Sequence, residues 1–409
     1  MRYLILGAGP AGVSAAETLV KADPEGHVTV VGGEPGEPYA RMAIPYVLTG
    51  KIDKSGTHLR KTPGYLQSLG VTYIEGHVHS AKPCAKTVRL HDGQHLSYDR
   101  MLIATGARPV TPDVPGMDLD GVSHCWTLDD ADAIAKRAKT GADVVLMGAG
   151  FIGCIILEAL VERGVNLTVV EAEDRMIAKM MDKTGGELLR RWVERKGVAL
   201  KTSTRVTEIR RHDGRLAVAT DRGGDLEADL VVVSVGVKPN TEFIENKSIA
   251  MDGGVTVNEF LRTNTEEIWA AGDVARGPGF GGGFAVHAIQ PTAVEHGRIA
   301  ALNMAGQEVA YQGSLPMNVL DTMGLISASY GDWNAGGDVA VRLDAADWRY
   351  TKLAFRDDRL VGALTIGRTD MVGALRGLIQ GRVKLGKWKD KLKADPTRTA
   401  EALVASFHD

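Results

Sequence analysis

The residues with the clearest chemical meaning are glycines in the pattern Gly-x-Gly-x-x-Gly, which occurs twice. The two copies are Gly7, Gly9, Gly12 and Gly148, Gly150, Gly153. Between a buried strand and a helix, the first glycine permits a tight turn, the second lets the backbone approach a pyrophosphate, and the third lets helix and strand pack closely. The anion lies against the unpaired N–H groups and positive dipole end of the helix. We therefore expect one chain to hold two dinucleotides.

An acidic residue follows each motif by about 20 residues, where a ribose hydroxyl needs an acceptor. Glu34 follows the apolar run 28–31 and two glycines, and Glu171 directly follows the run 167–170. A single glycine motif is weak support in a chain with 49 glycines. Two motifs, each with its own strand and its own acid, make chance a poor explanation.

The elements that must position these residues can be located from apolar runs typical of buried parallel strands. The runs lie at 3–6, 28–31, 101–104, 144–147, 167–170, 230–236 and 268–271. A helix is expected at 292–304, and beyond residue 311 strands are expected at 350–355 and 360–366, with a turn at Asp357 and Asp358. The sequence predicts an α/β fold with two Rossmann-like domains and a smaller C-terminal α+β domain.

Composition excludes several classes of protein. The net charge of −3 over 409 residues argues against a general nucleic-acid binder. The longest apolar stretch, 144–161, contains three glycines and Glu158, so we predict no membrane span. The chain begins directly in a strand, with no leader-like segment, and we expect it to be cytoplasmic. The three cysteines, Cys84, Cys125 and Cys154, are too far apart to suggest a disulfide framework or a metal site.

The order of motifs predicts discontinuous domains. Pro112, Pro115 and Gly116 mark a crossover, and the strand that ends in Gly272 and Asp273 returns to the first domain, where a carboxylate can face a ligand. The predicted domains are 1–115 with 240–310, then 116–239, then 311–409. Near the C-terminus six basic residues surround Asp390, as a solvated helix face or as a docking patch for an acidic protein. They are Arg382, Lys384, Lys387, Lys389, Lys391 and Lys393.

Over nearly its whole length the chain resembles the FAD-dependent pyridine nucleotide (disulfide) oxidoreductases with two dinucleotide folds. The resemblance rests on both glycine motifs and on the stretches 104–106, 235–240 and 271–273. It implies FAD in the first domain, NADH or NADPH in the second, a C-terminal interface domain and a homodimer. Glu34 is implied on the adenosine ribose of FAD, and Asp273 on its ribityl chain.

The resemblance implies the following binding residues. Those for FAD are Gly7, Gly9, Pro10, Ala11, Gly12, Glu34, Arg41, Ala104, Thr105, Gly106, Gly272 and Asp273. Those for NAD are Gly148, Gly150, Phe151, Ile152, Gly153, Glu171 and Gly236. We expect Glu171 to favour NADH, because a carboxylate binds the ribose diol and repels a 2′-phosphate, although Arg175 lies close enough in sequence to weaken that preference. Arg41 and Tyr46 are candidates for tuning the flavin, and no acid or base is assigned.

Within this family the chain looks closest to ferredoxin and rubredoxin reductases, the NADH-binding part of nitrite reductase, and NADH oxidases. Met42 stands where the oxidase group carries its redox cysteine, and a thioether cannot form a thiolate. Tyr46 stands in place of a lysine near the flavin. Ile155 stands in place of a glutamate of the NAD site, a change that could slow hydride transfer.

The sequence therefore predicts an oxidoreductase in which NADH passes a hydride to FAD, and electrons go on to a small ferredoxin- or rubredoxin-type protein or to a partner in a multicomponent system. Two alternatives stay open. One is an NADH oxidase that reduces oxygen or a quinone directly. The other is a redox-sensing flavoprotein with slow turnover, similar to the apoptosis-inducing-factor group.

Overall fold

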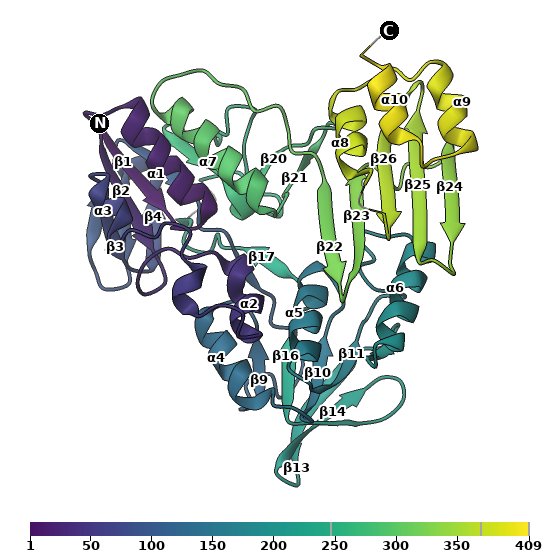
Figure 1. Ribbon diagram of the computed structural model, residues 1–409. Helices are drawn as coiled ribbons and strands as arrows, with labels where there is room; N and C mark the ends of the chain where they lie inside the picture. The colour runs from purple at the N-terminus through teal and green to yellow at the C-terminus, as the bar shows by residue number, and fades with distance from the viewer. Residues whose placement is uncertain (246–247, 369, 408–409) are drawn as a thin grey trace. The chain divides into compact units, whose positions relative to one another are not determined.

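The computed structural model describes residues 1–245, 248–368 and 370–407 (Figure 1). The chain forms two compact units. Unit 1 consists of Met1–Ala43, Asp53–Arg108 and Val237–Ser314, and unit 2 of Ile44–Ile52, Pro109–Gly236 and Leu315–Asp409. The segment Ile44–Ile52 thus groups with unit 2, although it lies between two stretches of unit 1. The division into three domains, and the assignment of one cofactor to each of the first two, stay predictions.

Unit 1 is built on a five-stranded parallel sheet in the order β19-β7-β1-β2-β3. Central β1 pairs with β2 so that Tyr3 lies opposite Val28, and with β7 so that Tyr3 lies opposite Arg100. Helices on a parallel sheet bury both of its faces, which explains the continuous apolar runs. The strands are β1 (Arg2–Leu6), β2 (His27–Gly32), β3 (Thr72–Glu75), β7 (Arg100–Ile103) and β19 (Ile268–Ala270).

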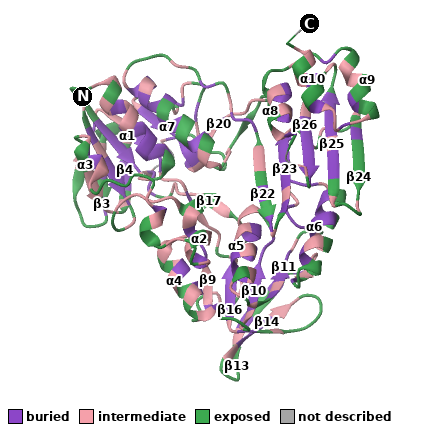
Figure 2. Ribbon diagram, viewed as in Figure 1, coloured by how far each residue is buried: buried purple, intermediate pink, exposed green. Residues whose placement is uncertain are grey.

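Two helices of unit 1, α1 (Pro10–Ala22) and α7 (Gln290–Met304), pack closely against each other. A Cβ at Gly297 of α7 would lie 2.1 Å from the carbonyl oxygen of Ala11, so only glycine allows this approach. The Ser14 hydroxyl of α1 also donates to the carbonyl of Val294 at 3.0 Å. The predicted helix at 292–304 is confirmed within α7, and Figure 2 shows the strands behind these helices as buried.

The other elements of unit 1 are short. One antiparallel sheet contains β4 (Val78–Lys82), β5 (Thr87–Leu90) and β6 (His95–Ser97), and a second small sheet contains β18 (Val255–Thr256), β20 (Ala275–Pro278) and β21 (Phe284–Ala285). Helix α3 (Tyr65–Ser68) and the 3-10 turn η5 (Gly272–Val274) complete the unit's main elements. Strand β8 (Ala107–Pro109) pairs with β17 (Val237–Pro239) where the chain leaves and re-enters unit 1.

Unit 2 repeats the same strand–turn–helix plan in a parallel sheet ordered β12-β11-β10-β16-β9. Here β10 pairs with β11 and β16, as β1 pairs with β2 and β7 in unit 1. A three-stranded antiparallel sheet, β13-β14-β15, adjoins it. The elements are α2 (Ile44–Leu48), β9 (Val122–His124), α4 (Leu128–Arg137), β10 (Asp143–Met147), α5 (Phe151–Glu162), β11 (Asn166–Val170), α6 (Lys183–Arg195), β12 (Ala199–Lys201), β13 (Val206–His212), β14 (Arg215–Thr220), β15 (Leu226–Ala228) and β16 (Leu230–Val233).

The C-terminal part of unit 2 is an antiparallel sheet ordered β22-β23-β26-β25-β24 with three helices. The predicted hairpin is confirmed, and its turn residue Asp357 has φ 54°. Asp182, the N-cap of α6, accepts hydrogen bonds from Tyr350 Oη at 2.7 Å and Lys352 Nζ at 3.2 Å. The elements are β22 (Met317–Thr322), β23 (Leu325–Gly331), β24 (Val339–Asp344), β25 (Arg349–Arg356), β26 (Arg359–Ile366), α8 (Val372–Gln380), α9 (Lys387–Ala394) and α10 (Thr399–Ala405).

The described helices include none that combines the length and the hydropathy needed to cross a bilayer.

Candidate dinucleotide-binding sites

The first glycine motif forms the turn between β1 and α1. Gly7 has φ 113°, and a Cβ there would lie 2.2 Å from the carbonyl oxygen of Ala104 at the end of β7. Its N–H donates to Val31 O at 2.8 Å, which ties the turn to β2. A Cβ at Gly12 would lie 1.9 Å from Gly7 O. These two glycines are required by packing within the protein itself.

Packing within the protein does not require a glycine at position 9, because Gly9 is exposed and a Cβ there would meet no atom within 4 Å. The absence of a side chain instead leaves room for a ligand. It is the N-cap of α1, no side chain caps the helix, and Pro10 begins it. The first-turn N–H groups are thus open to an external acceptor, as an anion site requires. A pyrophosphate fits this position, since the space beside Gly9 and the positive helix end coincide.

Glu34 and Arg41, both predicted to contact FAD, are brought together by the loop after β2. The Glu34 carboxylate accepts a hydrogen bond from Tyr39 Oη at 2.5 Å and forms an ion pair with Arg41. The Arg41 guanidinium also lies 5.7 Å from the Tyr39 ring centroid. Glu34 is therefore held in place by its neighbours, and its remaining lone pairs are available to a ribose hydroxyl.

Gly272 and Asp273 lie in η5, directly after β19, close to the start of α1. A Cβ at Gly272 would lie 3.1 Å from the Cβ of Ala11. Burial raises the pKa of the Asp273 carboxyl, and the Arg41 charge partly opposes that rise. The carboxyl ends of β1, β2, β7 and β19 therefore gather the predicted FAD residues at one edge of the sheet, the usual ligand edge of such folds.

The stretch Ala104–Gly106 is fixed by Asn240, where the chain returns to unit 1. Thr105 Oγ1 donates to Asn240 O at 2.7 Å, and Asn240 Nδ2 donates to Thr105 O at 2.9 Å. Gly106 has φ 64°, and its carbonyl accepts the Asn240 N–H at 2.9 Å. These reciprocal bonds join the end of β7 to the returning chain.

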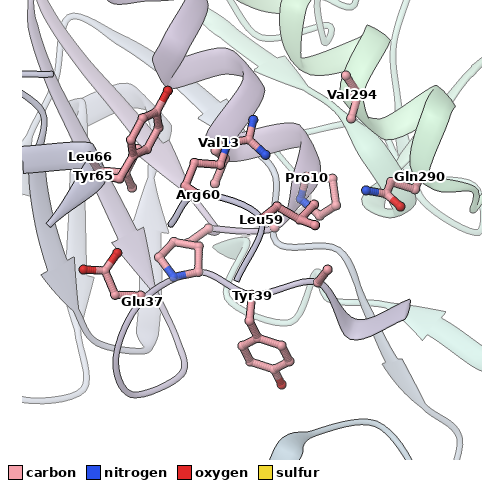
Figure 3. A pocket seen from close by; sticks show the side chains of 14 residues that line it. Pro10, Val13, Glu37, Tyr39, Leu59, Arg60, Tyr65, Leu66, Gln290 and Val294 are labelled. Atoms are coloured by element: carbon pink, nitrogen blue, oxygen red, sulfur yellow. The ribbon is translucent and has the colours of Figure 1, made fainter. Parts of the chain in front are cut away.

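A hollow opens beside the first glycine turn, between α1, α7 and the loop Glu37–Ala40 (Figure 3). Its lining includes Pro10, Leu59 and Val294, and its two charged side chains, Glu37 and Arg60, already have hydrogen-bond partners. Glu37 accepts the Gly64 N–H at 2.6 Å, and Arg60 makes two 2.9 Å bonds to Glu17. A mainly apolar hollow beside an anion site suits a ligand that carries rings as well as phosphates.

The second glycine motif has the same geometry in unit 2. Gly148 has φ 99°, its N–H donates to Val170 O at 2.8 Å, and a Cβ there would lie 2.3 Å from Ser234 O. A Cβ at Gly153 would lie 2.3 Å from Gly148 O. Gly150, the exposed N-cap of α5, again has open space and no side-chain cap. The residues of this turn therefore also fit a pyrophosphate.

The second turn has additional bonds at Ala149. Glu171 is only 8% exposed, and its carboxylate accepts N–H groups from Ala149 at 2.6 Å and Glu173 at 2.8 Å. Ile177 donates its N–H to Ala149 O at 2.8 Å. Ile177 is a buried β-branched residue with φ 43°, an uncommon conformation that clusters at functional sites. The backbone N–H and the carbonyl group of Ala149 are therefore both held by hydrogen bonds.

Arg175 is directed into its own loop. Its guanidinium donates to Met181 O at 3.0 Å and Ala178 O at 3.3 Å, and it pairs with Asp174.

The other predicted NAD residues lie near the same turn in unit 2. Gly236, with φ 119°, follows β16, and a Cβ there would meet nothing within 4 Å. Phe151 and Ile152, in the first turn of α5, are partly buried.

The two candidates for flavin tuning, Arg41 and Tyr46, belong to different units. Tyr46 is 54% exposed on α2, and Met42 is 66% exposed in unit 1. Within unit 2, Arg163 donates to Leu48 O at 2.5 Å and so anchors α2 to the end of α5. Ile155 is partly buried on α5.

Two of the three thiols are buried. Burial raises the pKa values of Cys125 and Cys154 to about 12, which suppresses the thiolate needed for redox chemistry. Cys84 is exposed. Among the described residues no group of three or more His, Cys, Asp or Glu side chains is arranged to hold a metal ion.

The basic C-terminal cluster is partly neutralised. Lys389 and Lys393 both pair with Asp338 at 2.8 Å, and Lys391 lies 4.2 Å from the Trp388 ring centroid. The interpretation as a solvated helix face therefore accounts for much of the cluster.

Sequence reasoning missed three contributors to the sites. Tyr39 holds Glu34, Asn240 holds Thr105, and His296 accepts the Gly272 N–H at 3.4 Å. Asn240 lies inside the stretch 235–240 that carried the resemblance, and Tyr39 lies two residues before Arg41. His296 carries no sequence signal, because a lone histidine in an apolar helix pattern has many explanations.

Comparison with known proteins agrees with this geometry. Residues 1–308 match the family model described as pyridine nucleotide-disulphide oxidoreductase, and residues 316–383 match the rubredoxin NAD+ reductase C-terminal domain. The NADH-dependent phenylglyoxylate dehydrogenase subunit epsilon of Aromatoleum evansii is 28% identical, covering 99% of this chain and 97% of that protein. The ferredoxin–NAD(+) reductase component of the Burkholderia cepacia anthranilate 1,2-dioxygenase system is 30% identical and covers 97% of each.

A solved structure shares the fold over the full length. The covalent putidaredoxin reductase–putidaredoxin complex contains a chain that matches with a TM-score of 0.92 at 23% identity, covering 100% of this chain and 99% of that one. This match confirms the predicted α/β fold, and the family match over residues 1–308 confirms the predicted family. The chain belongs to the pyridine nucleotide-disulphide oxidoreductase family, whose members are enzymes that use FAD and a pyridine nucleotide.

Proposed function

We propose that this enzyme takes electrons from NADH and passes them, through FAD, to a small ferredoxin- or rubredoxin-type protein. The observation that carries the proposal is the pair of glycine turns, each with an uncapped helix N-terminus and open space beside its middle glycine. The relative from the anthranilate dioxygenase system, named as a ferredoxin reductase, supports the acceptor class.

The residues at the ends of β1, β2, β7 and β19 hold FAD in this proposal. The α1 N-terminus binds the pyrophosphate, Glu34 the adenosine ribose and Asp273 the ribityl chain. When bound, FAD supplies the chemistry that accepts a hydride and releases electrons one at a time. The protein's own residues align the two nucleotides and exclude competing reactions.

The second turn binds NADH in preference to NADPH. The buried Glu171 carboxylate keeps lone pairs for a ribose hydroxyl and repels a phosphate. Arg175, the neighbouring cation that could offset this repulsion, is engaged by carbonyl oxygens of its own loop and by Asp174. We therefore expect a strong NADH preference.

The acceptor is a carrier rather than a thiol substrate. Met42 replaces the redox cysteine, and both buried cysteines have raised pKa values. A direct NADH oxidase that reduces oxygen or a quinone is the first alternative. A slowly reacting redox sensor is the second, and Ile155 on α5 is the residue that favours it.

The similarity to a dehydrogenase subunit supports a specific setting for the carrier reaction. That relative is 28% identical to this chain and is matched over 97% of its own length. In that setting the enzyme exchanges electrons with an iron–sulfur partner inside a multicomponent complex.

Further parts of the proposal concern organisation. The domains are 1–115 with 240–310 for FAD, 116–239 for NADH and 311–409 as an interface domain. We propose a cytoplasmic homodimer, which sedimentation of the purified enzyme would test.

Stopped-flow spectroscopy tests the function. NADH should bleach the flavin within milliseconds to seconds in the absence of oxygen, and added ferredoxin or rubredoxin should restore the colour. Fast NADH consumption in air without any carrier would favour the oxidase. Slow bleaching with a long-lived charge-transfer band would favour the sensor.

A further inference from the structure

His296 of α7 is a buried histidine in contact with Gly272, one of the predicted FAD-binding residues. It is 2% exposed, and its Nδ1 accepts the backbone N–H of Gly272 at 3.4 Å. Its ring packs edge-on against Tyr311, with ring centroids 4.6 Å apart. Tyr311 is itself fixed by a 2.7 Å hydrogen bond to Ser314. The imidazole is therefore held in one orientation.

The bond to Gly272 is placed where it can affect a ligand. Gly272 has φ 75°, lies against Ala11 of the first glycine turn and directly precedes Asp273. Its left-handed conformation turns the chain from β19 into η5. A group that fixes the Gly272 N–H therefore fixes the Ala271–Gly272 peptide, one residue before the Asp273 carboxylate.

We infer that His296 is a positioning residue for FAD, which holds Gly272 and thereby aims Asp273 at the ribityl chain. This rests on the proposed FAD site in unit 1. In this inference His296 acts on FAD only through Gly272, to which it is bonded. Its contribution is the acceptor atom Nδ1, which only a neutral imidazole provides.

The protonation state follows from the contacts. Because Nδ1 accepts, the ring proton is on Nε2, which is buried without a hydrogen-bond partner among the described residues. The titratable groups of the surrounding elements include His287 before α7, Glu295 and Arg298 on α7, Tyr311 after it and Asp273 in η5. Burial, with a smaller contribution from His287, lowers the pKa of His296 to about 4. Protonated His296 would present an N–H to the Gly272 N–H, and the bond would be lost.

Three substitutions separate the acceptor from the bulk of the ring. His296→Asn places an amide oxygen near the position of Nδ1, and His296→Gln places its amide near Nε2. His296→Phe keeps the ring and removes both nitrogens. His287→Phe is the matched control, because it removes a neighbouring half-buried imidazole that has no bond to Gly272. The measurement is the rate at which the diluted holoenzyme releases FAD at pH 7.5, followed by flavin fluorescence.

We expect His296→Phe and His296→Gln to release FAD about tenfold faster, as loss of one hydrogen bond predicts. His296→Asn and His287→Phe should stay within about threefold of wild type, a difference below one hydrogen bond. Equal rates for the Asn and Gln variants would overturn the inference, and this comparison holds even if the Phe variant fails to fold.

The pH profile supplies a second readout that a purely structural role would not move. Wild-type FAD release should accelerate as the pH falls from 6 towards 4, while the His296→Asn variant, which keeps Asp273 but lacks the imidazole, should accelerate less. Identical profiles would contradict the inference. Wild-type enzyme that neither contains nor takes up FAD would instead refute the FAD site itself, so the two failures can be told apart.

Discussion

The Glu171 carboxylate accepts the backbone N–H of Ala149 at 2.6 Å, inside the second glycine turn. The residue predicted to select the nucleotide therefore also shapes the turn that binds its pyrophosphate. A second oxygen of the same carboxylate accepts the Glu173 N–H. A change at this carboxylate should therefore affect both the geometry of the turn and the choice between NADH and NADPH.

Glu171→Gln should weaken both roles at once. The amide keeps one oxygen acceptor but loses the charge, so one of the two N–H groups is left without its partner. We expect kcat/KM for NADH to fall about tenfold, as loss of one charge-assisted hydrogen bond predicts. The ratio of NADPH to NADH efficiency should rise. Steady-state rates with both nucleotides measure this, and Glu173→Gln, at an exposed carboxylate, is the control. An unchanged ratio would contradict the role assigned to Glu171.

The glycines of each turn divide into two classes that alanine can separate. Gly150→Ala and Gly9→Ala add a Cβ to open space, so the fold should remain stable while affinity for NADH or FAD drops. Gly153→Ala and Gly12→Ala force a Cβ against a carbonyl oxygen at 2.3 and 1.9 Å. Those two variants should lose about 1–3 kcal/mol of stability, as overpacking does. Thermal unfolding and nucleotide titration would check both classes, and equal stability losses in all four would contradict the division.

Asp273→Asn should separate stability from cofactor binding. The raised pKa of Asp273 means that its charged form is unfavourable in the folded protein. The native state therefore holds its proton more tightly than the unfolded chain, and this group lowers stability as the pH rises through the folded pKa. At pH 7 the neutral amide should raise the melting temperature of the FAD-free protein by a few degrees, about 1 kcal/mol. FAD should dissociate faster from the same variant. A lower melting temperature without FAD would count against this account.

His296 should make the protein less stable in acid. Its folded pKa of about 4 lies below the ordinary value of 6.5, so the unfolded chain binds more protons in between. The stabilisation is complete above pH 6.5 and is lost as the pH falls towards 4, by on the order of 3 kcal/mol. Denaturant unfolding across this range should show a smaller pH slope for His296→Asn. Equal slopes would assign acid sensitivity to other groups.

The basic cluster near the C-terminus is tested by one exposed residue. Lys387→Glu changes the surface charge without breaking a described ion pair, and the interpretation as a solvated face predicts an unchanged KM for a ferredoxin or rubredoxin. Lys389→Glu also breaks the pair with Asp338, and should cost up to about 1 kcal/mol of stability. If the KM for the carrier rises severalfold in Lys387→Glu, the interpretation of the cluster as a docking patch would be favoured instead.

The sequence alone determined the two turns, the parallel strands around them and the acids that follow. Each depends on local rules, because glycine is needed where φ is positive and a strand buried on both faces must be apolar throughout. The positive φ angles of Gly7 and Gly148 could therefore be predicted from the sequence without any tertiary information. Motif spacing likewise placed Glu34 and Glu171 at the ends of the neighbouring strands.

Only the tertiary structure decided which partners each functional group keeps. Glu34 pairs with Arg41, Arg175 is occupied by its own loop, the segment Ile44–Ile52 groups with unit 2, and His296 meets Gly272 across 24 residues of chain. Such contacts depend on side-chain direction and on close packing between elements distant in sequence, and no local pattern encodes either. The chemistry was therefore readable from residue types, whereas the arrangement that supports it was set by the fold.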